Sequence, residues 1–340
     1  MIQLDSRITY GCDPEAFFER NGEVIGSEKV LPKSGWNYVK RDGVQIEFQP
    51  LAYASVKSQL VHLREVMNSF RSNMTRFPDV KVCFKPVIQV SEAELATLGE
   101  ESRLLGCKPS DNIYGFKQID VDGQVFRTRS AGGHLHIGLY DERRIWNTDV
   151  YPHLDERARL VPILDVLVGN TCVLFDMDPV QRQRRKMYGR PGEYRLPWHG
   201  VEYRTLSNFW MRSPVLAELV FGLAQLSVGV LSTTLSGREN LEKELLYNLD
   251  WRKIVKAIYL NDRTTALENW KVVRDFLIKQ APKGSVINGD NIRKFDKLIE
   301  IVGEKGLDVF FPLEGDAVIK GWASYNNYNT SWGNFLGSIQ

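Results

Sequence analysis

The segment formed by residues 130–140, SAGGHLHIGLY, constrains the fold more than any other stretch of this chain. Its pattern predicts a β-strand, and because a single residue separates His134 from His136, both imidazoles point to the same face of the sheet. Three glycines flank the histidines and remove side chains there, so a large ligand can approach the backbone closely. We therefore expect a sheet with a polar, ligand-binding face rather than a strand that serves packing alone.

Composition narrows the class of protein. The chain has 340 residues, 43% of them apolar, which is enough for a large core in one domain or two. The net charge of +2 gives no general reason to expect nucleic acid or an anionic membrane as a partner. The N-terminus lacks the apolar core of a signal peptide and no apolar run reaches the length of a membrane span, so we expect a cytoplasmic protein. The four cysteines are far apart without a CxxC pair, which favours reduced thiols over disulfides or zinc.

Short strands and helices are mixed through the first two thirds of the chain. The Asn21-Gly22 pair predicts a hairpin, and a capping box at Ser91 and Glu94 opens a short helix that ends near residue 105. Apolar residues at helical spacing predict an amphipathic helix over residues 55–77 that covers a sheet. The segments predicted as strands are residues 8–20, 23–25, 44–51, 81–90, 130–140 and 200–210.

Helices dominate the remainder of the chain. Residues 155–175 predict a largely buried helix, in which Pro162 either makes a kink or sits in the first turn. Ser213-Pro214 is a strong helix start for a buried helix that continues to residue 231, and residues 291–304 carry one apolar stripe. Hairpins with helices to one side favour an α+β fold with a mostly antiparallel sheet.

Charged side chains recur at alternating positions of four predicted strands, which is expected if one face of a sheet lines a polar site. These residues are Asp13 and Glu15 in the first strand, Glu47 in the second, His134 and His136 in the third, and Glu202 and Arg204 in the fourth. Burying so many charges without partners costs several kcal/mol each at order of magnitude. The pattern therefore requires metal ions or a solvated cleft.

The types of residue indicate which ions and ligands fit. Carboxylate oxygens with few cysteines suit Mg²⁺ or Mn²⁺ better than a structural zinc site. Residues 181–195 add six basic side chains, Arg185 and Arg195 among them, on what the glycines at 189 and 192 mark as a flexible loop that suits polyphosphate. Carboxylates that hold Mg²⁺ beside arginines that neutralise phosphoryl oxygens are the equipment for phosphoryl transfer.

Four motifs resemble a known family. In order, GCDPEAFF, VQIEFQP, GGHLHIG and GVEYRTLSN are similar to segments of the phage-type (phiEco32-like) carboxylate-amine ligases of the glutamine synthetase and glutamate-cysteine ligase superfamily. The resemblance implies a curved, mostly antiparallel sheet with flanking helices, like the glutamine synthetase catalytic domain. It also implies an enzyme that uses ATP and two or three Mg²⁺ ions, with Mn²⁺ as an alternative, to join a carboxylate to an amine through an acyl phosphate.

The resemblance assigns roles by motif. Asp13, Glu15, Glu47, His134 and Glu202 are the implied metal ligands, whereas His136 faces the nucleotide phosphate. Arg204 meets the transferred phosphoryl group or the substrate carboxylate. Arg185 and Arg195 resemble the arginines that neutralise phosphate. The resemblance also implies a catalytic role for Arg195.

Two departures from the family leave the number of metal ions open. Asp13 stands where the family more often has glutamate, and the family's additional acids between the second strand and the HxH motif have no counterpart in the sequence. The resemblance also implies a catalytic core over residues 1–235, with a mostly helical part over residues 236–340 packed on it. The expected partners are a small-molecule or peptide carboxylate and an amine, and we expect neither nucleic acid nor a membrane. If a phage encodes the chain, the expected location is the host cytoplasm. The protein could form an oligomer.

Simpler interpretations stand beside these. An isolated HxH is more often incidental, Glu47 on a strand is usually exposed to solvent, and an arginine run is most often a solvated face. The aromatic tail between residues 322 and 332 is either a binding lip or, as we expect, packed against the core. Two other functions remain open, a guanidino-type phosphotransferase and a non-catalytic phage structural or interaction protein that retains the fold.

Overall fold

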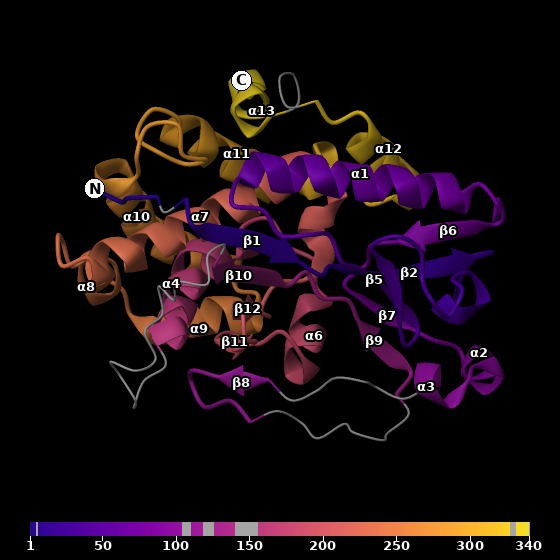
Figure 1. The fold of residues 1–340 in the computed structure, drawn as a ribbon. Coiled ribbons are helices and arrows are strands. Elements are labelled where there is room, and N and C mark those ends of the chain that lie inside the picture. The colour runs from indigo at the N-terminus through magenta and orange to yellow at the C-terminus, as the bar shows by residue number, and fades with distance from the viewer. Residues whose placement is uncertain (5, 104–109, 118–125, 140–155, 327–330, 340) are drawn as a thin grey trace.

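In the part of the chain that the structure describes, two five-stranded sheets, a two-stranded sheet and a layer of helices make up the fold (Figure 1). The computed structural model describes residues 1–4, 6–103, 110–117, 126–139, 156–326 and 331–339. The elements mix hairpins with helices, and all the strand pairs are antiparallel. The predicted α+β class with a curved, mostly antiparallel sheet is confirmed.

The central sheet has the strand order β1-β10-β12-β11-β8. Its strands are β1 (Ile8–Cys12), β10 (Leu135–Leu139), β12 (Gly200–Tyr203), β11 (Glu193–Arg195) and β8 (Asp111–Asn112). Alternation along these strands sends Tyr10, Ile137 and Val201 into the apolar core, where each is at most 1% exposed. The neighbouring residues therefore point to the opposite, polar face.

The chain passes from the central sheet into the second sheet between β1 and β2. Its strands are β2 (Glu15–Arg20), β3 (Glu23–Ile25), β5 (Gln45–Phe48), β4 (Val39–Asp42) and β6 (Val80–Cys83), the last paired with β2. We predicted one strand over residues 8–20, but the structure has two, because Pro14 has no N–H to donate to a ladder and its φ is fixed. The chain thus leaves the central sheet at Asp13 and enters the second at Glu15.

Proline divides a second predicted strand in the same way. Residues 81–90 form the end of β6 and then β7 (Val87–Gln89), which pairs with β9 (Thr128–Ser130) instead of continuing the same sheet. Pro86 lies between them. The hairpin at Asn21-Gly22 forms as predicted, with positive φ at both residues and Phe18 opposite Ile25.

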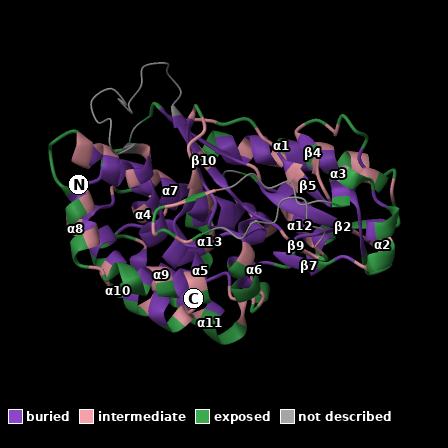
Figure 2. Cartoon of the chain, turned by 90° about the horizontal axis from the view of Figure 1, so that it is seen from below, coloured by how far each residue is buried: buried purple, intermediate pink, exposed green. Residues whose placement is uncertain are grey.

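Helices cover the apolar faces of the sheets. Helix α1 (Val56–Met74) begins after Ser55, whose hydroxyl accepts from the amide of Ser58, and it packs against β1 and helix α7. The other helices are α2 (Glu92–Thr97), α3 (Glu100–Arg103), α4 (Leu160–Leu164), α5 (Asn170–Val173), α6 (Gln181–Met187), α7 (Pro214–Leu235), α8 (Leu241–Tyr247), α9 (Trp251–Leu260), α10 (Arg263–Gln280), α11 (Ile292–Lys305), α12 (Gly315–Ala323) and α13 (Trp332–Ser338). Figure 2 shows the central elements buried and the outer faces of α8, α10 and α11 exposed.

Helix α7 is the central helix of the core. By length and composition it is apolar enough to cross a membrane, so the expectation that no run reaches that length was wrong. However, 83% of its most apolar window is buried inside the protein, as is typical of a core helix. Ser213 caps it and Pro214 occupies its first turn, as predicted.

Two helical segments differ from expectation. Residues 160–173 form α4, a π-helical stretch at Asp165–Gly169 and α5, with Pro162 in the first turn of α4. Residues 181–187, predicted as part of a flexible loop, form helix α6, and the buried guanidinium of Arg184 donates to the carbonyls of Thr205 and Leu206. A run of Arg, Gln, Lys and Met favours helix, and buried backbone acceptors hold it in place.

The C-terminal part consists of helices α8–α13 in the described residues. Trp322 and Trp332 are buried, and their indole N–H groups donate to the carbonyls of Met211 and Val286. The aromatic tail therefore packs against the core as expected, although Tyr328 lies outside the described residues. Cys12, Cys83 and Cys172 are free and buried, whereas Cys107 also lies outside the described residues. The division of the chain at residue 235 stays a prediction.

Candidate active site

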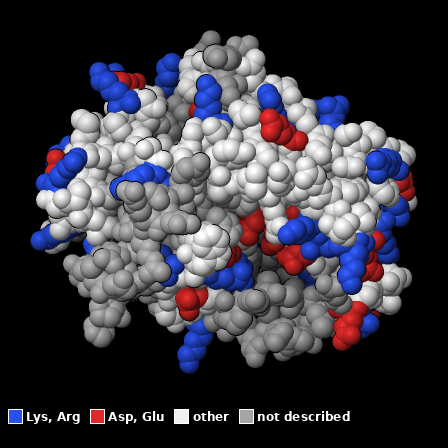
Figure 3. Space-filling model, viewed as in Figure 1, with Lys and Arg blue, Asp and Glu red and all other residues white. Residues whose placement is uncertain are grey.

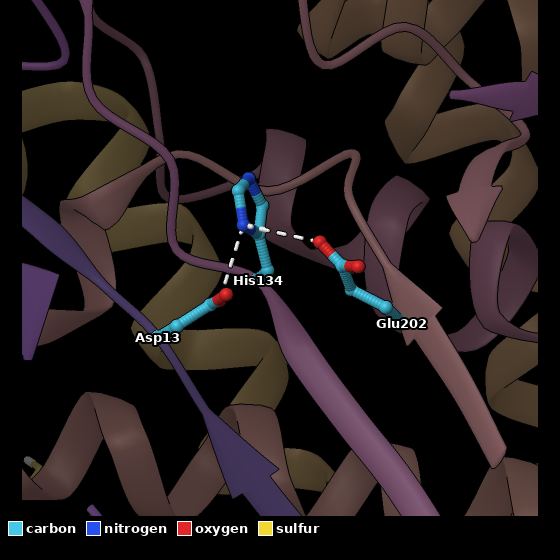
Figure 4. A group of neighbouring side chains, drawn as sticks. All are labelled: Asp13, His134 and Glu202. Atoms are coloured by element: carbon cyan, nitrogen blue, oxygen red, sulfur yellow. Dashed lines mark ion pairs between the residues drawn. The ribbon is translucent and has the colours of Figure 1, made fainter. Parts of the chain in front are cut away.

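Three neighbouring strands bring distant residues to one end of the polar face. Asp13 directly follows β1, His134 directly precedes β10, and Glu202 lies in β12. Since β10 pairs with both other strands, their side chains converge there, as Figure 4 shows. The candidate ligands of the first, third and fourth motifs are thus brought together.

Asp13, His134 and Glu202 form the first candidate metal group. Nδ1 of His134 lies 3.1 Å from Oδ1 of Asp13 and 3.7 Å from Oε1 of Glu202. One ligand atom from each of the three residues lies within 4.8 Å of the others. His136 reaches the same aspartate from the next position on this face, with 3.1 Å between its Nε2 and Oδ2 of Asp13. Asp13 thus bridges the two histidines.

Glu15, Asp42 and Glu47 form the second candidate metal group, in the second sheet. Glu15 lies opposite Glu47 in the β2–β5 register, and Asp42 ends the neighbouring strand β4. Their ligand oxygens also lie within 4.8 Å of one another. Like charges directly opposite each other destabilise a sheet, and a divalent cation removes that repulsion.

Asp42 is a candidate ligand that we did not predict from the sequence. In the sequence, the Asp42-Gly43 pair is a turn signal and gives no sign of metal binding. Its side chain reaches the two glutamates because β4, which we did not predict, pairs with β5 over the whole of both strands. The available signal in the sequence was an acid five residues before Glu47, in a part of the chain that already carries Asp13 and Glu15.

The electrostatics of the first group favour a neutral imidazole between charged partners. Burial and the positive charge of Arg204 lower the pKa of His134 to about 4. Burial alone would raise the pKa of Asp13, but His134 and His136 outweigh it and hold the pKa of Asp13 below its usual range. For Glu202 the upward effect of burial is outweighed by Arg204, so its pKa is also lowered. At neutral pH this group therefore offers two carboxylates and an unprotonated imidazole, the forms that ligate a metal.

In the second group the pKa values of the carboxyls are raised instead of lowered. Burial and the nearby negative charge of Asp13 raise the pKa of Glu47 to about 7 and also raise that of Asp42. The pKa of Glu15 is raised by burial and by the charge of Asp42, against the effect of a hydrogen bond from the amide of Gly132. Carboxyls held this closely are expected to resist ionisation until a cation is present. The charge of Asp13 acts on all three, so the two groups belong to one site.

Arginines border the acidic groups. Arg204 forms an ion pair with Glu202, and Nη1 of Arg195 lies 3.6 Å from the same carboxylate, as expected from the pairing of β11 with β12. The pKa of Asp42 is raised by burial and by Asp13, and the charges of Arg204 and Arg195 oppose this rise, so both guanidiniums act on the second group as well. Their positive charges are available beside both candidate ions.

Arg185 has its contacts away from the two candidate metal groups. It projects from α6, donates to Oδ1 of Asn261 at 2.8 Å, and its strongest charged partner is Asp176. Tyr203, which points to the opposite side of β12 from Glu202, is among the groups that act on the pKa of Arg185. These contacts do not bring Arg185 to the metal groups, and its role at phosphate stays a prediction.

A cavity of about 320 Å³ opens beside Asp13 and His136. Its lining consists of Thr9, Gly11, Cys12, Asp13, Glu47, Gln49, Pro50, Ala52, His136, Gly138 and His199. We did not select His199 from the sequence, yet its Nε2 lies 3.2 Å from Nδ1 of His136. On the face seen in Figure 3, acidic and basic side chains gather around a hollow below the middle of the molecule.

The glycines beside the histidines serve internal packing first. A Cβ at Gly133 would lie 2.3 Å from the carbonyl oxygen of Ser207, and one at Gly132 would lie 2.3 Å from Nε2 of His134. These glycines let the segment before β10 pack against the residues after β12. Gly138 lines the cavity, but a Cβ there would also lie 2.9 Å from the carbonyl oxygen of His199, so ligand approach at this glycine stays a prediction.

The arrangement as a whole can hold two divalent cations and a polyanion. Oxygen-rich ligand groups suit Mg²⁺ or Mn²⁺, and the adjoining arginines suit phosphoryl oxygens. A cavity of a few hundred Å³ next to them is within the size range of small-molecule sites.

Comparisons with known proteins agree with part of this interpretation. Residues 122–287 match the family described as phage phiEco32-like COOH.NH2 ligase-type 2, which confirms the resemblance inferred from the motifs. This segment contains the histidine and Glu202 motifs, whereas Asp13, Glu15, Asp42 and Glu47 precede it. No curated protein matches the chain.

Two solved structures show weak similarity. A bifunctional glutathione synthetase from Pasteurella multocida has 11% identity and a TM-score of 0.38, and the match covers 90% of this chain and 58% of that chain. A novel glutamine synthase homolog has 13% identity and a TM-score of 0.36, and the match covers 88% of this chain and 71% of that one. Scores this low support no argument about fold or function.

Proposed function

We propose that this chain, whose residues 122–287 match a carboxylate-amine ligase family, is an ATP-dependent ligase that joins a carboxylate to an amine with the help of Mg²⁺. The supporting observation is the meeting of two candidate metal groups and two arginines at the junction of the two sheets. A simple binding module has no need for so many buried charges, each of which is costly without a partner.

The residues present fit two cations. Asp13, His134 and Glu202 would hold one ion, and Glu15, Asp42 and Glu47 the other. Oδ1 of Asp13 is buried and faces Nδ1 of His134 at 3.1 Å, so two ligand atoms of the first group already point at each other where a cation would sit. When bound, such ions neutralise phosphate oxygens and align the transferred phosphoryl group.

The cavity next to His136 would receive the nucleotide. His136 carries a raised pKa, because Asp13 outweighs the effect of burial, and a protonated imidazole at this position favours phosphate. Arg195 lies across Glu202 from His136 in the sheet, and Arg204 lies two residues after Glu202 on β12. Both would meet charge that develops on the phosphoryl group.

The reaction has two steps in this proposal. A carboxylate oxygen of the first substrate attacks the γ-phosphorus of ATP, and the bond to the leaving ADP breaks, giving an acyl phosphate. The amine then attacks the acyl carbon, phosphate leaves, and the amine loses a proton, giving the amide. The chain's own groups orient the reactants and balance charge, which supplies most of the catalysis in phosphoryl transfer.

Hydroxylamine trapping tests the proposal without knowledge of the natural amine. The protein is incubated with Mg·ATP, a panel of amino acids and dicarboxylic acids, and hydroxylamine, and both hydroxamate and ADP are measured. We expect equal amounts of the two, dependent on the acid, and loss of both in Glu202→Gln. A stable phosphorylated product without hydroxamate would instead indicate a phosphotransferase. Failure to bind Mg·ATP in calorimetry would indicate a non-catalytic protein and overturn the proposal.

A further inference from the structure

Tyr188 is a buried tyrosine in contact with the first candidate metal group. It follows α6 in extended backbone and its side chain is 8% exposed. Two guanidiniums lie over its ring, with the Cζ atoms of Arg184 and Arg204 each 5.1 Å from the ring centroid. The ring also meets His134 edge-on, at 5.4 Å between centroids. The tyrosine is thus fixed in place on three sides.

The tyrosine hydroxyl joins two residues of the site. Nη2 of Arg204 donates to this oxygen at 3.0 Å, and the hydroxyl forms a second hydrogen bond with Nε2 of His134. A guanidinium has only donors, so the hydroxyl oxygen is an acceptor toward Arg204. Whether it donates to His134 or accepts from it depends on the tautomer of the imidazole.

The other nitrogen of His134 decides the tautomer. Nδ1 is the atom that faces Asp13 and Glu202, so it is the nitrogen that a cation in this group would use. A nitrogen ligates only through a free lone pair, so in the metal-bound state the hydrogen sits on Nε2. Nε2 must then donate, and the oxygen of Tyr188 is its acceptor.

We propose that Tyr188 is a positioning residue, which accepts hydrogen bonds from both His134 and Arg204 and thereby keeps Nδ1 of His134 free for a divalent cation. This inference rests on the proposed function only in that the first group binds a cation. The opposite arrangement, with the hydroxyl donating to Nε2, would put the hydrogen on Nδ1 and block the ligand position. Residues that orient a metal-binding histidine in this way change metal affinity by about 10- to 100-fold when they are replaced.

Tyr188→Phe is the direct test, because it keeps the ring and its contacts with the two guanidiniums and removes only the oxygen. Mn²⁺ binding is measured by the EPR signal of free Mn²⁺ on the otherwise unaltered full chain. We expect the affinity of one site to fall about 10- to 100-fold. An unchanged affinity in a folded variant would overturn the inference.

Tyr203→Phe is the matched control. Tyr203 is buried as well and lies next to Glu202 on β12, but it points to the opposite face and donates to Oδ1 of Asp165 at 2.6 Å. Its loss is expected to lower the melting temperature while Mn²⁺ affinity stays within about twofold of the unaltered protein. An equal loss of affinity in both variants would mean a general structural effect and would contradict a specific role for Tyr188.

A spectroscopic measurement needs no folded variant of Tyr188. The chain has five histidines, and ¹⁵N-histidine labelling with Mg²⁺ present distinguishes protonated from unprotonated ring nitrogens, with His134→Gln used for assignment. We expect a hydrogen on Nε2 of His134, and a hydrogen on Nδ1 would refute the inference. If the unaltered protein bound neither Mn²⁺ nor Mg²⁺, the proposed function itself would fail; normal binding that Tyr188→Phe leaves unchanged would refute this inference alone.

Discussion

Replacing Glu47 by glutamine is expected to stabilise the metal-free protein at alkaline pH. Glu47 lies opposite Glu15 in the second group, and burial together with the charge of Asp13 raises its pKa from 4.5 to about 7. Between these values the folded protein binds a proton that the unfolded chain releases. Stability is therefore present in full below pH 4.5 and is lost as the pH rises toward 7.

The size of the effect follows from the shift. Each unit of pKa difference corresponds to about 1.4 kcal/mol, so the ionised Glu47 costs on the order of 3 kcal/mol at pH 8 and less than about 1 kcal/mol at pH 5. Glutamine has the same shape without the charge, and its oxygen can still accept the hydrogen bond from Gln49. The raised pKa of Glu15 and Asp42 acts in the same direction, which makes the pH dependence of the unaltered protein steeper still.

Urea denaturation of EDTA-treated protein at pH 5 and pH 8 measures this difference. Glu47→Gln should raise the free energy of unfolding at pH 8, have little effect at pH 5, and weaken the stabilisation by Mg²⁺. Glu300→Gln is the control, since Glu300 lies at the surface beside Lys297 and should change stability by less than about 0.5 kcal/mol at both pH values. Destabilisation by Glu47→Gln at pH 8, or an equal effect at both pH values, would refute the reasoning.

Three other outcomes are expected. Glu202→Gln should lower kcat by at least about 100-fold in the hydroxamate assay, while Arg204→Lys, which keeps the charge but loses the planar fork, should lower it less; equal activity of Glu202→Gln and the unaltered protein would remove that carboxylate from the mechanism. Gly133→Ala should lower the melting temperature markedly because its Cβ would lie 2.3 Å from the carbonyl oxygen of Ser207, whereas Gly321→Ala, with nothing within 4 Å, should be neutral or slightly stabilising. Adding Mg²⁺ to EDTA-treated protein at pH 8 should raise the melting temperature in proportion to the logarithm of its concentration, and a flat response would argue against both metal groups.

Features determined by a few neighbouring residues could be predicted from the sequence. Asn21-Gly22 gave the hairpin, Ser55 and Ser213 gave the starts of α1 and α7, and the spacing of apolar residues gave α11. Side-chain alternation also showed that His134 and His136 share a face. These signals are local because turns, caps and amphipathic faces depend on contacts within one or two turns of the chain.

Strand pairing and helix packing decided which distant residues of the candidate site meet. Nothing near Asp42 in the sequence indicates that it lies beside Glu15 and Glu47, because the β4–β5 and β2–β5 registers bring them together. Tyr188 reaches His134 only because α6 packs under the residues after β12, where Arg184 holds it through backbone carbonyls. The sequence alone determined which chemical groups are present and which local elements carry them. The tertiary structure decided which groups meet, since their distances depend on contacts between residues far apart in the chain.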